Sequence, residues 1–210
     1  MSSVKRPIFA RIYTRFSQAA EKAGTAAHRD ELLGGVAGRV IEVGAGNGLN
    51  FTHYPSSVVE VVAVEPEPYL RDRASEEAER ASVPITVMPG TAEDLPADDE
   101  SFDIAVTSLV LCSVLDPSRA LQEIKRVLRP GGELRFFEHV RSHDHRLARV
   151  QTVADKTIWP RVAGGCHAAR DTRQAIADAG FEIDDERRFD FRPCSLAFLT
   201  APHIIGRARR

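Results

Sequence analysis

The sequence predicts an α/β fold with a doubly wound sheet, in which mostly parallel strands alternate with helices. A short apolar run at 40–43 leads directly into a glycine-rich loop at 44–48. Further apolar and β-branched runs follow at 58–64, 85–88 and 102–111, and helical patterns separate them. The 210 residues suit one α/β domain, and a chain of this length buries roughly 70% of its unfolded surface.

The composition narrows the class of protein. The chain has 28 basic and 30 acidic side chains, so its net charge is near zero. We therefore expect no nucleic-acid partner bound through a broad basic surface. No signal peptide and no apolar run of about 18 residues is found, which favours a cytoplasmic protein without a stable membrane anchor. Three cysteines without a CxxC pair predict neither a disulfide framework nor a zinc site.

Two helices are expected before the first strand. Apolar side chains recur at spacings of three and four over 8–20, on one helical face that includes Tyr13. A shorter helix over 28–33 ends at a glycine pair. Residues 1–35 are therefore expected to form an N-terminal helical cap, and packing against the sheet is its simplest interpretation.

The glycine-rich loop after the first strand is the predicted ligand site. Its glycines alternate with small or polar residues: Gly44, Ala45, Gly46, Asn47 and Gly48. With so few side chains, a ligand can approach the backbone N–H groups closely. A helix beginning near Leu49 would point its positive end at the same place. We therefore expect a ligand with an anionic end and a nucleoside, although the glycines alone also suit a tight structural turn.

The spacing of these glycines distinguishes two nucleoside ligands. The dinucleotide fingerprint needs a glycine at its sixth position, which here is Leu49. Glu42 lies two residues before Gly44, and the E-x-G-x-G-x-G pattern resembles motif I of the class I S-adenosylmethionine-dependent methyltransferases. This resemblance implies that the loop wraps the methionine part of the cofactor and that Glu42 orients its amino-acid end. It also makes a lid over the cofactor an equal interpretation of the helix over 8–20.

An acidic residue follows the second strand. The run 58–64 ends at Glu65 and Pro66, and Glu65 lies 21 residues beyond Gly44. This is close to the offset of about 20 residues at which a strand-end carboxylate binds a ribose hydroxyl. We therefore assign Glu65 and Pro66 to the cofactor site, and we expect the highly charged helix over 69–81 to face solvent.

The loop after the strand at 85–88 reads GTAEDLP. It resembles the G-D-A-E-x-L-P loop that holds adenine in many small-molecule methyltransferases, which implies that the Ala92 N–H meets a ring nitrogen. Thr91 replaces the usual aspartate, so Glu93 becomes the candidate partner of the exocyclic amine. A solvated loop charge is the alternative role for Glu93.

In a doubly wound sheet, the strand over 102–111 is expected beside the first strand. The strand order reverses between these two strands, and ligands bind at that point. The carboxyl end of the strand over 102–111 then places Ser108 and Leu109 near the transferable methyl group of the cofactor. Cys112 follows at once and is a candidate for the acceptor pocket.

The C-terminal part completes the sheet. Pro117 opens an amphipathic helix, and a fifth strand is expected over 133–140. A last helix over 170–179 is followed by two strands, 181–189 and 195–208. The run RVLRPGG resembles the segment after motif IV of the same superfamily. By this resemblance we expect a Rossmann-like seven-stranded sheet of order 3-2-1-4-5-7-6 with strand 7 antiparallel.

The region 141–173 is expected to form a substrate-side insertion. His139, at the end of the fifth strand, is the candidate catalytic residue, because a neutral imidazole can accept a proton from a thiol, phenol or amine. A structural histidine is the alternative. Trp159 and Cys166, together with Tyr13, are further candidates for the acceptor pocket.

Two other arrangements of these side chains are not expected. His139, His143 and His145 straddle a strand end and a loop and need not converge, so no metal site is expected. Cys166 and His167 are adjacent in the chain and would rarely face each other, which argues against a nucleophilic Cys–His pair.

Four further stretches narrow the resemblance: LVLCSV, EHV, the Gly165–Cys166 pair and PHIIGRA. They resemble the methyltransferase-like proteins that methylate alkyl thiols and their bacterial relatives. The animal members carry a hydrophobic N-terminal membrane anchor. No such anchor is expected here, because this region contains basic residues: Lys5, Arg6, Arg11 and Arg15.

The resemblance implies direct transfer of the methyl group of S-adenosylmethionine to a small-molecule acceptor. A thiol is slightly favoured over a phenol, a quinol or a lipid headgroup amine. A cofactor-binding protein that acts only by interaction is the alternative from another class, and a nicotinamide oxidoreductase is disfavoured by Leu49. The acceptor, the oligomeric state and the pathway are left open by the sequence.

Overall fold

The computed structural model describes residues 6–210, apart from the side chains of Ser195 and Leu196. Lys5 and the rest of residues 1–5 of the expected cap lie outside this range. The described strands are β1 (Gly38–Val43), β2 (Val58–Val64), β3 (Ile85–Met88), β4 (Phe102–Ser108), β5 (Leu128–His139), β6 (Glu182–Asp190) and β7 (Pro202–Arg209).

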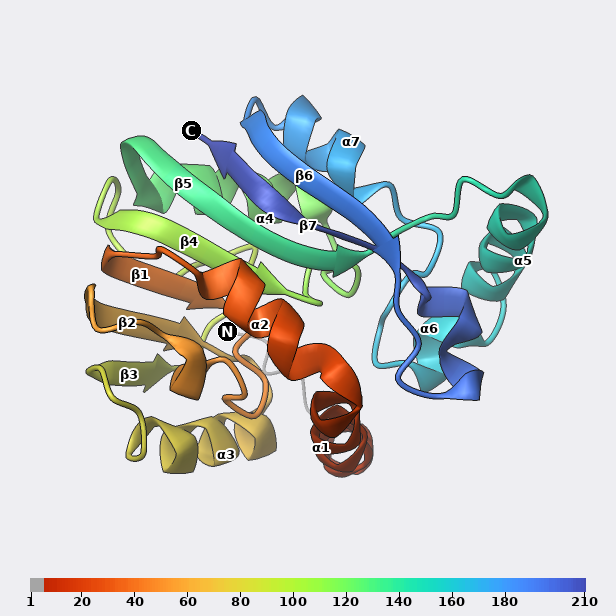
Figure 1. Cartoon of the computed structure of the whole chain (residues 1–210), viewed down its shortest axis with the longest axis horizontal. Helices are drawn as coiled ribbons and strands as arrows, with labels where there is room; N and C mark the ends of the chain where they lie inside the picture. Colours follow the sequence, from red (N-terminus) through yellow and green to blue (C-terminus); the bar gives the residue numbers. More distant parts are fainter. Residues whose placement is uncertain (1–5) are drawn as a thin grey trace.

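These strands form one seven-stranded sheet in the order β3-β2-β1-β4-β5-β7-β6 (Figure 1). β7 is antiparallel to β5 and to β6, and the other neighbouring strands are parallel. The expected strand order and the antiparallel seventh strand are therefore confirmed. Val43 of β1 pairs with Val64 of β2 and with Thr107 of β4, so the carboxyl ends of these three strands lie at one edge.

Helices cover both faces of the sheet. α2 (Ala26–Leu33) and α3 (Pro68–Ala78) pack on one face, and α4 (Pro117–Val127) and α7 (Thr172–Asp178) pack on the other. In Figure 1, α2 lies in front of the sheet, and α4 and α7 lie behind it. This is the arrangement of a doubly wound fold, in which central parallel strands are apolar on both sides.

Each face has its own apolar core. Leu121 and Ile124 of α4 pack with Phe136 of β5, whereas Leu33 of α2 packs with Phe137, and all five side chains are fully buried. Phe136 and Phe137 are consecutive, so they project from opposite faces of their strand. The FF pair thus joins the two cores through the sheet.

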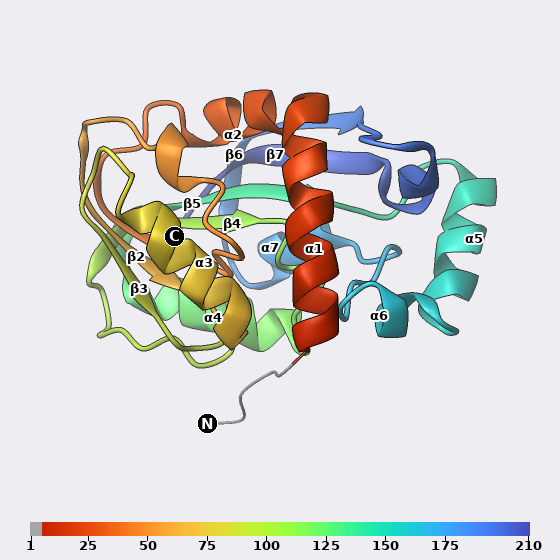
Figure 2. The ribbon, with the colours of Figure 1, turned by 90° about the horizontal axis from the view of Figure 1, so that it is seen from below.

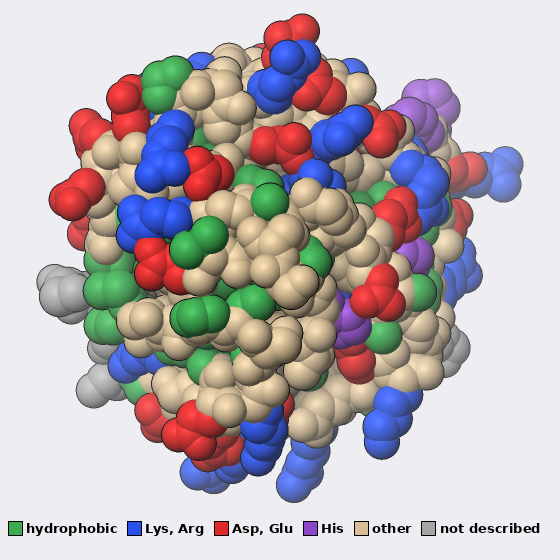
Figure 3. Space-filling model, turned by 60° about the vertical axis from the view of Figure 1, so that its left-hand side comes forward, with side chains coloured by type: hydrophobic (Ala, Val, Ile, Leu, Met, Phe, Trp, Pro, Cys, Tyr) green, Lys and Arg blue, Asp and Glu red, His purple; other side chains and the backbone are tan. Residues whose placement is uncertain are grey.

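The remaining helices lie toward the carboxyl ends of the parallel strands. α1 (Pro7–Ala20) runs across the strand direction in Figure 2, and α5 (His145–Asp155) and α6 (Trp159–Val162) lie beyond the end of β5. No helix within residues 6–210 has the length and apolarity to cross a membrane. On the face shown in Figure 3, Lys and Arg side chains are interspersed with Asp and Glu.

The segment after the glycine loop differs from the prediction. The expected helix near Leu49 does not form; residues 49–50 make a turn, and a single 3₁₀ turn follows at Phe51–His53. Phe51 is fully buried, and the Asn50 side-chain amide donates to the Glu42 carboxylate, so both side chains hold this segment against the core. The glycine loop therefore does not meet the positive end of a helix.

The fourth strand is shorter than predicted, ending at Ser108 rather than at residue 111. Leu109 has a left-handed φ of +60°. The buried carboxylate of Glu138 accepts the N–H groups of Val110 and Leu111, each at 3.0 Å. These backbone groups are therefore unavailable to a sheet ladder, and the chain turns away from the sheet.

The closing hairpin also differs in its bounds. The strand predicted over 195–208 begins only at Pro202, and Ser195–Thr200 forms 3₁₀ turns. The Leu199 carbonyl accepts from the buried amide of Gln151 on α5 at 2.8 Å instead of from a neighbouring strand. β5, in contrast, begins earlier than residue 133, because Leu128 already pairs with Phe102 of β4.

Candidate active site

A cavity of about 1230 Å³ opens at the carboxyl ends of β1, β2, β4 and β5 and is covered by residues of α1. It lies where the strand order reverses, between β1 and β4, as expected for a doubly wound sheet. The residues assigned from the sequence that line it are Tyr13, Gly44, Gly46, Glu65, Pro66, Thr91, Ala92, Glu93, Ser108, Leu109, Cys112, His139, Trp159 and Cys166. Glu42, Ala45, Asn47 and Gly48 do not line it.

The glycine loop exposes its backbone to this cavity. Gly44 and Gly46 have φ values of +71° and +58°, in the left-handed region that favours glycine. A Cβ on Gly44 would lie 2.6 Å from the side chain of Val110, and one on Gly46 would lie 3.5 Å from the Tyr13 ring. The loop therefore needs glycine both for its conformation and for the open space beneath α1.

Glu65 is part of the wall beside this loop. Its side chain is 5% exposed, and its two oxygens accept the N–H groups of Gly46 at 2.8 Å and of Glu67 at 2.9 Å. Burial raises the pKa of Glu65 to about 7, although the two backbone donors oppose this shift. Each carboxylate oxygen has a second lone pair, so Glu65 can hold the loop and still accept a ligand hydroxyl.

Glu42 lies behind the loop in a buried polar network. It accepts from the Asn50 amide at 2.9 Å and from the Tyr54 hydroxyl at 2.7 Å. Asn50 in turn accepts from Arg29, whose guanidinium also donates to Ser108 Oγ at 3.3 Å. Sequence reasoning missed Arg29, Asn50 and Tyr54. Only their side-chain contacts with other elements distinguish them from ordinary helix and loop residues.

Asn47 has a different position from the one expected of a cofactor ligand. Its Oδ1 accepts from Ser17 Oγ of α1 at 3.3 Å, and both side chains are buried. Asn47 therefore joins the glycine loop to the helix that covers the cavity.

The loop at 91–95 forms another part of the wall. Ala92 is buried, and the Thr91 carbonyl accepts from the Asp94 N–H at 3.2 Å, which closes a tight turn. One oxygen of Glu93 accepts the Leu115 N–H at 2.9 Å. The Glu93 carboxylate thus joins this loop to the segment preceding α4.

The turn after β4 is held by two charged residues that sequence reasoning did not assign. Besides the bonds from Glu138 described above, Arg170 donates to the carbonyls of Leu111 at 2.6 Å and Val114 at 2.9 Å. Burial raises the pKa of Glu138, against the effect of its backbone donors. The sequence did contain a signal for Glu138, because an acidic residue inside an apolar strand such as FFEHV is expected to be buried and paired.

Two thiols and an imidazole meet at the other end of the cavity. His139 Nε2 lies 3.1 Å from Cys166 Sγ, and Trp159 Nε1 donates to the same sulfur at 3.3 Å. Cys112 joins them, so that the donor atoms of Cys112, His139 and Cys166 all lie within 4.8 Å of one another. All three residues are buried.

The contacts of Cys166 and of the histidines differ from those considered in the sequence analysis. Cys166 meets His139 and not its neighbour His167, whose N–H donates to the Cys112 carbonyl at 2.8 Å. His143 and His145 are exposed in the loop and helix after β5. A hydrogen bond from Cys112 lowers the pKa of the Cys166 thiol, against the effect of burial.

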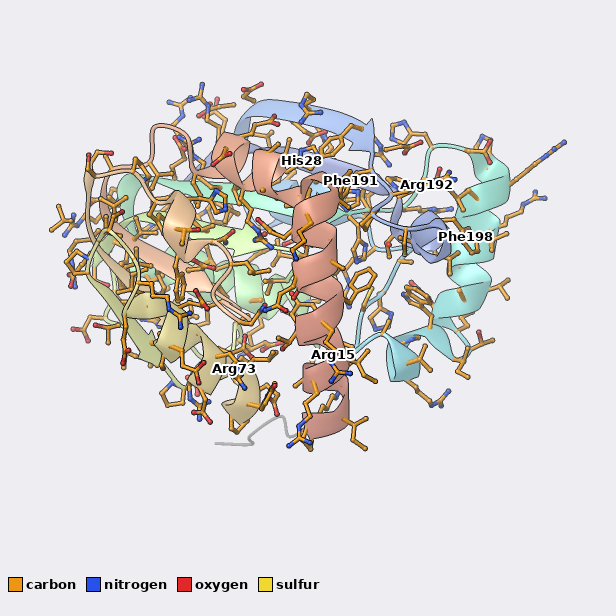
Figure 4. The ribbon with its side chains drawn as sticks, turned by 60° about the horizontal axis from the view of Figure 1, so that its bottom comes forward. Arg15, His28, Arg73, Phe191, Arg192 and Phe198 are labelled. Carbon is orange, nitrogen blue, oxygen red and sulfur yellow. The ribbon has the colours of Figure 1, made fainter. Side chains whose placement is uncertain are left out.

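An aromatic wall lines the cavity beside this cluster, and sequence reasoning missed it. His203 of β7 stacks on Phe137 with ring centroids 5.3 Å apart. Phe191, after β6, meets His28 of α2 edge-on at 5.0 Å (Figure 4). Burial lowers the pKa of His203 to about 4, so this imidazole is neutral near pH 7. The wall is therefore uncharged and suited to apolar groups.

Comparison with known proteins identifies the family. A family model described as "Methyltransferase domain" matches residues 41–136. Thiol S-methyltransferase TMT1B of Homo sapiens is 37% identical over 185 residues, which cover 84% of this chain and 73% of that protein. The chain belongs to the class I S-adenosylmethionine-dependent methyltransferases.

Two further relatives of the methyltransferase extend this comparison. An uncharacterized methyltransferase of Mycobacterium tuberculosis is 41% identical over 127 residues, covering 60% of this chain and 49% of that protein. The crystal structure of a methyltransferase of Thermotoga maritima superimposes with a TM-score of 0.70 at 25% identity, covering 96% of each chain.

The methyltransferase uses S-adenosylmethionine as its methyl donor, and the geometry of its site fits this molecule. The left-handed glycines leave the loop backbone open to the cavity, and the Glu65 carboxylate is buried beside them. Bound there, S-adenosylmethionine supplies an activated methyl group on a sulfonium. The residues around it have to bind it, align an acceptor and exclude water.

Proposed function

We propose that this methyltransferase transfers the methyl group to the sulfur of a small apolar thiol. The observation that carries the proposal is a single cavity that extends from the glycine loop to the Cys112, His139 and Cys166 cluster. Its volume of about 1230 Å³ exceeds the roughly 300–1,000 Å³ of ordinary ligand sites, which allows room for a cofactor and an acceptor together. The similarity to thiol S-methyltransferase TMT1B supports a thiol as the acceptor.

The cofactor end of the cavity would use the residues assigned from the sequence. The backbone of Gly44–Gly48, with Ala45 and Asn47 shaping the loop, would wrap the methionine part, and Glu42 would act from behind this loop. Glu65 and Pro66 would contact the ribose. Thr91, Ala92 and Glu93 would surround the adenine, and Ser108 and Leu109 would lie beside the methyl group.

The acceptor end would use the side chains on the opposite side of the cavity. Cys112, His139, Trp159 and Cys166 would surround the reacting sulfur, and Tyr13, whose ring also lies against Gly46 of the cofactor loop, would contact the acceptor from between the two ends. Four phenylalanine rings also line the cavity: Phe9, Phe16, Phe137 and Phe191. These rings favour an apolar substituent on the thiol. The proton-accepting role of His139 stays a prediction.

We further propose that the reaction takes place in the cytoplasm, without a nucleic-acid partner. Cys112, Cys166 and Cys194 are free thiols, which agrees with a reducing compartment. The near balance of 28 basic and 30 acidic side chains supports a small-molecule acceptor rather than a polyanion.

The test is methyl transfer from S-adenosylmethionine to a panel of an alkanethiol, a phenol, a quinol and a primary amine, with products identified by mass spectrometry. We expect kcat/KM for the thiol to exceed kcat/KM for each other acceptor by at least about tenfold. This ratio corresponds to a difference of about 1.4 kcal/mol in activation free energy. A reaction without enzyme corrects for spontaneous methylation. Preference for an oxygen or nitrogen acceptor would reject the thiol, and cofactor binding without any transfer would favour a non-catalytic protein.

A further inference from the structure

Three soft metal donors converge in the acceptor half of the cavity. Cys112 follows β4, His139 ends β5 and Cys166 follows α6, so three separate segments supply them. Their exposed fractions are 2%, 6% and 7%. The tertiary structure therefore holds all three donor side chains in place.

The spacing of the donor atoms agrees with metal coordination. Zinc bonds of about 2.3 Å to sulfur and 2.0–2.1 Å to nitrogen place tetrahedral ligands roughly 3.5–3.8 Å apart. Here Cys166 Sγ and His139 Nε2 are 3.1 Å apart, and all pairs of donors lie within 4.8 Å. Side-chain shifts of about an ångström or less would complete the geometry.

The surroundings of the cluster hold its donors in position. The indole N–H of Trp159 donates to Cys166 Sγ, a contact that also suits a metal-bound thiolate. The His167 N–H donates to the Cys112 carbonyl at 2.8 Å, which ties the loop carrying Cys166 to the turn carrying Cys112. Glu138 and Arg170 fix that turn from its other side.

We infer that Cys112, His139 and Cys166 bind a zinc ion whose fourth position faces the cavity and takes the acceptor thiol. Two thiolates and an imidazole suit zinc, and three protein ligands with one open position are the arrangement of catalytic zinc sites. The role for the acceptor rests on the thiol methylation proposed above, whereas the metal site rests on the geometry alone.

The metal would supply what thiol methylation needs, because a thiolate and not a thiol is the nucleophile. On binding zinc, the acceptor thiol releases its proton to water. Its sulfur then forms a bond to the methyl carbon as the bond from that carbon to the sulfonium sulfur breaks, and the electron pair stays with S-adenosylhomocysteine. In this reaction His139 acts as a metal ligand, which replaces the proton-accepting role predicted from the sequence.

The first experiment measures metal binding without any methyl transfer. The full chain, kept reduced by a non-thiol reductant and freed of metal with a chelator, is titrated with Co²⁺. One equivalent should bind with thiolate-to-cobalt charge-transfer absorption. Cys112→Ser and Cys166→Ser should each weaken binding more than about 100-fold, because removing a ligand should cost at least as much as removing an outer-shell contact.

Cys194→Ser is the matched control, because Cys194 is an exposed free thiol outside the cluster. It should bind Co²⁺ as the parent protein does. Titration with S-adenosylhomocysteine identifies variants whose cofactor site remains folded. Absence of saturable Co²⁺ binding, or equal binding by Cys112→Ser and Cys194→Ser, would overturn the site.

The second experiment tests the role of the metal. Adding an alkanethiol to the Co²⁺ protein with S-adenosylhomocysteine should strengthen the charge-transfer absorption as a third thiolate joins, and an unchanged spectrum would overturn that role. Chelation should lower thiol methylation at least tenfold, and Zn²⁺ should restore it. Equal rates with and without zinc would reject the inference and leave the proposed function standing. Stoichiometric metal binding without methylation of any acceptor would reject the function and support the metal site.

Discussion

At the scale of single residues, Gly46 joins the two sides of the cofactor end of the cavity. Its N–H donates to the buried Glu65 carboxylate, and its open α-carbon faces the Tyr13 ring. The left-handed φ of +58° allows both contacts. A side chain at this position would keep the fold but fill the space between the loop and α1.

Gly46→Ala should weaken binding of S-adenosylhomocysteine by at least about tenfold, equivalent to about 1.4 kcal/mol. The added Cβ would occupy the ligand side of the loop, 3.5 Å from Tyr13. Calorimetric titration measures the affinity. Gly35→Ala is the matched control, because Gly35 has a φ of +74° and no atom within 4 Å of an added Cβ.

Both alanine variants should lose roughly 1–2 kcal/mol of stability from left-handed strain, but only Gly46→Ala should lose affinity. Similar affinities for the two variants would contradict the assignment of the glycine loop to the cofactor.

At the scale of elements, α1 covers the cavity with little apolar anchoring of its own. Only Ala10 and Ser17 of this helix are buried, whereas Ile8 and Ile12 are 78% and 62% exposed. The contact between Ser17 and Asn47 joins it to the glycine loop. A helix held by so few buried groups depends on what fills the cavity beneath it.

Binding of S-adenosylhomocysteine should therefore slow amide hydrogen exchange in α1, on the order of tenfold. The ligand would fill the space against Tyr13 and add contacts that the empty cavity lacks. Mass spectrometry of peptic peptides measures the change. α7 is the internal control, because none of its residues lines the cavity and its Thr172 and Ile176 are buried.

Unchanged exchange in α1 at saturating ligand would favour the simpler role, a helix that only packs on the sheet. Slowing of α1 and α7 together would indicate general stabilisation of the protein and would also contradict a lid.

At the scale of the whole molecule, buried carboxylates make stability depend on pH. Burial raises the pKa of Glu42 to about 7 from 4.5, against the hydrogen bonds from Tyr54 and Asn50. The folded protein thus holds this proton more tightly than the unfolded chain does. The free energy of unfolding should therefore fall as the pH rises from about 4.5 to about 7.

Glu42→Gln should remove part of this pH dependence, because the amide stays neutral in both states. Between pH 5 and pH 8, the free energy of unfolding of the parent protein should fall by roughly 2–3 kcal/mol more than that of the variant. Urea unfolding without cofactor at a series of pH values measures this difference.

Glu79→Gln is the control for this comparison, since Glu79 is exposed after α3. It should follow the parent curve. If Glu42→Gln showed the full pH dependence of the parent, the Glu42 carboxyl would titrate normally in the folded protein.

The sequence by itself determined the alternation of strands and helices and the meeting of the glycine loop with Glu65 at one edge of the sheet. Strand periodicity, the run from Val43 into Gly44 and the offset from Gly44 to Glu65 are local or nearly local signals. Once strands are parallel, their carboxyl ends share one edge, so Gly46 and Glu65 had to meet. Resemblance to a family supplied the order of the strands and the antiparallel seventh strand.

Only the tertiary structure decided which side chains meet at the acceptor end. His139 lies 27 residues after Cys112, and Cys166 lies 27 residues after His139. No helix or strand periodicity relates residues so far apart. Their meeting depends on the turn at Leu109, the end of β5 and the loop after α6 together. The missing helix at Leu49 and the early end of β4 have related causes, because the buried carboxylates of Glu42 on β1 and Glu138 on β5 bind side-chain or backbone groups of those segments. Contacts of this kind follow from packing in three dimensions, which local patterns do not encode.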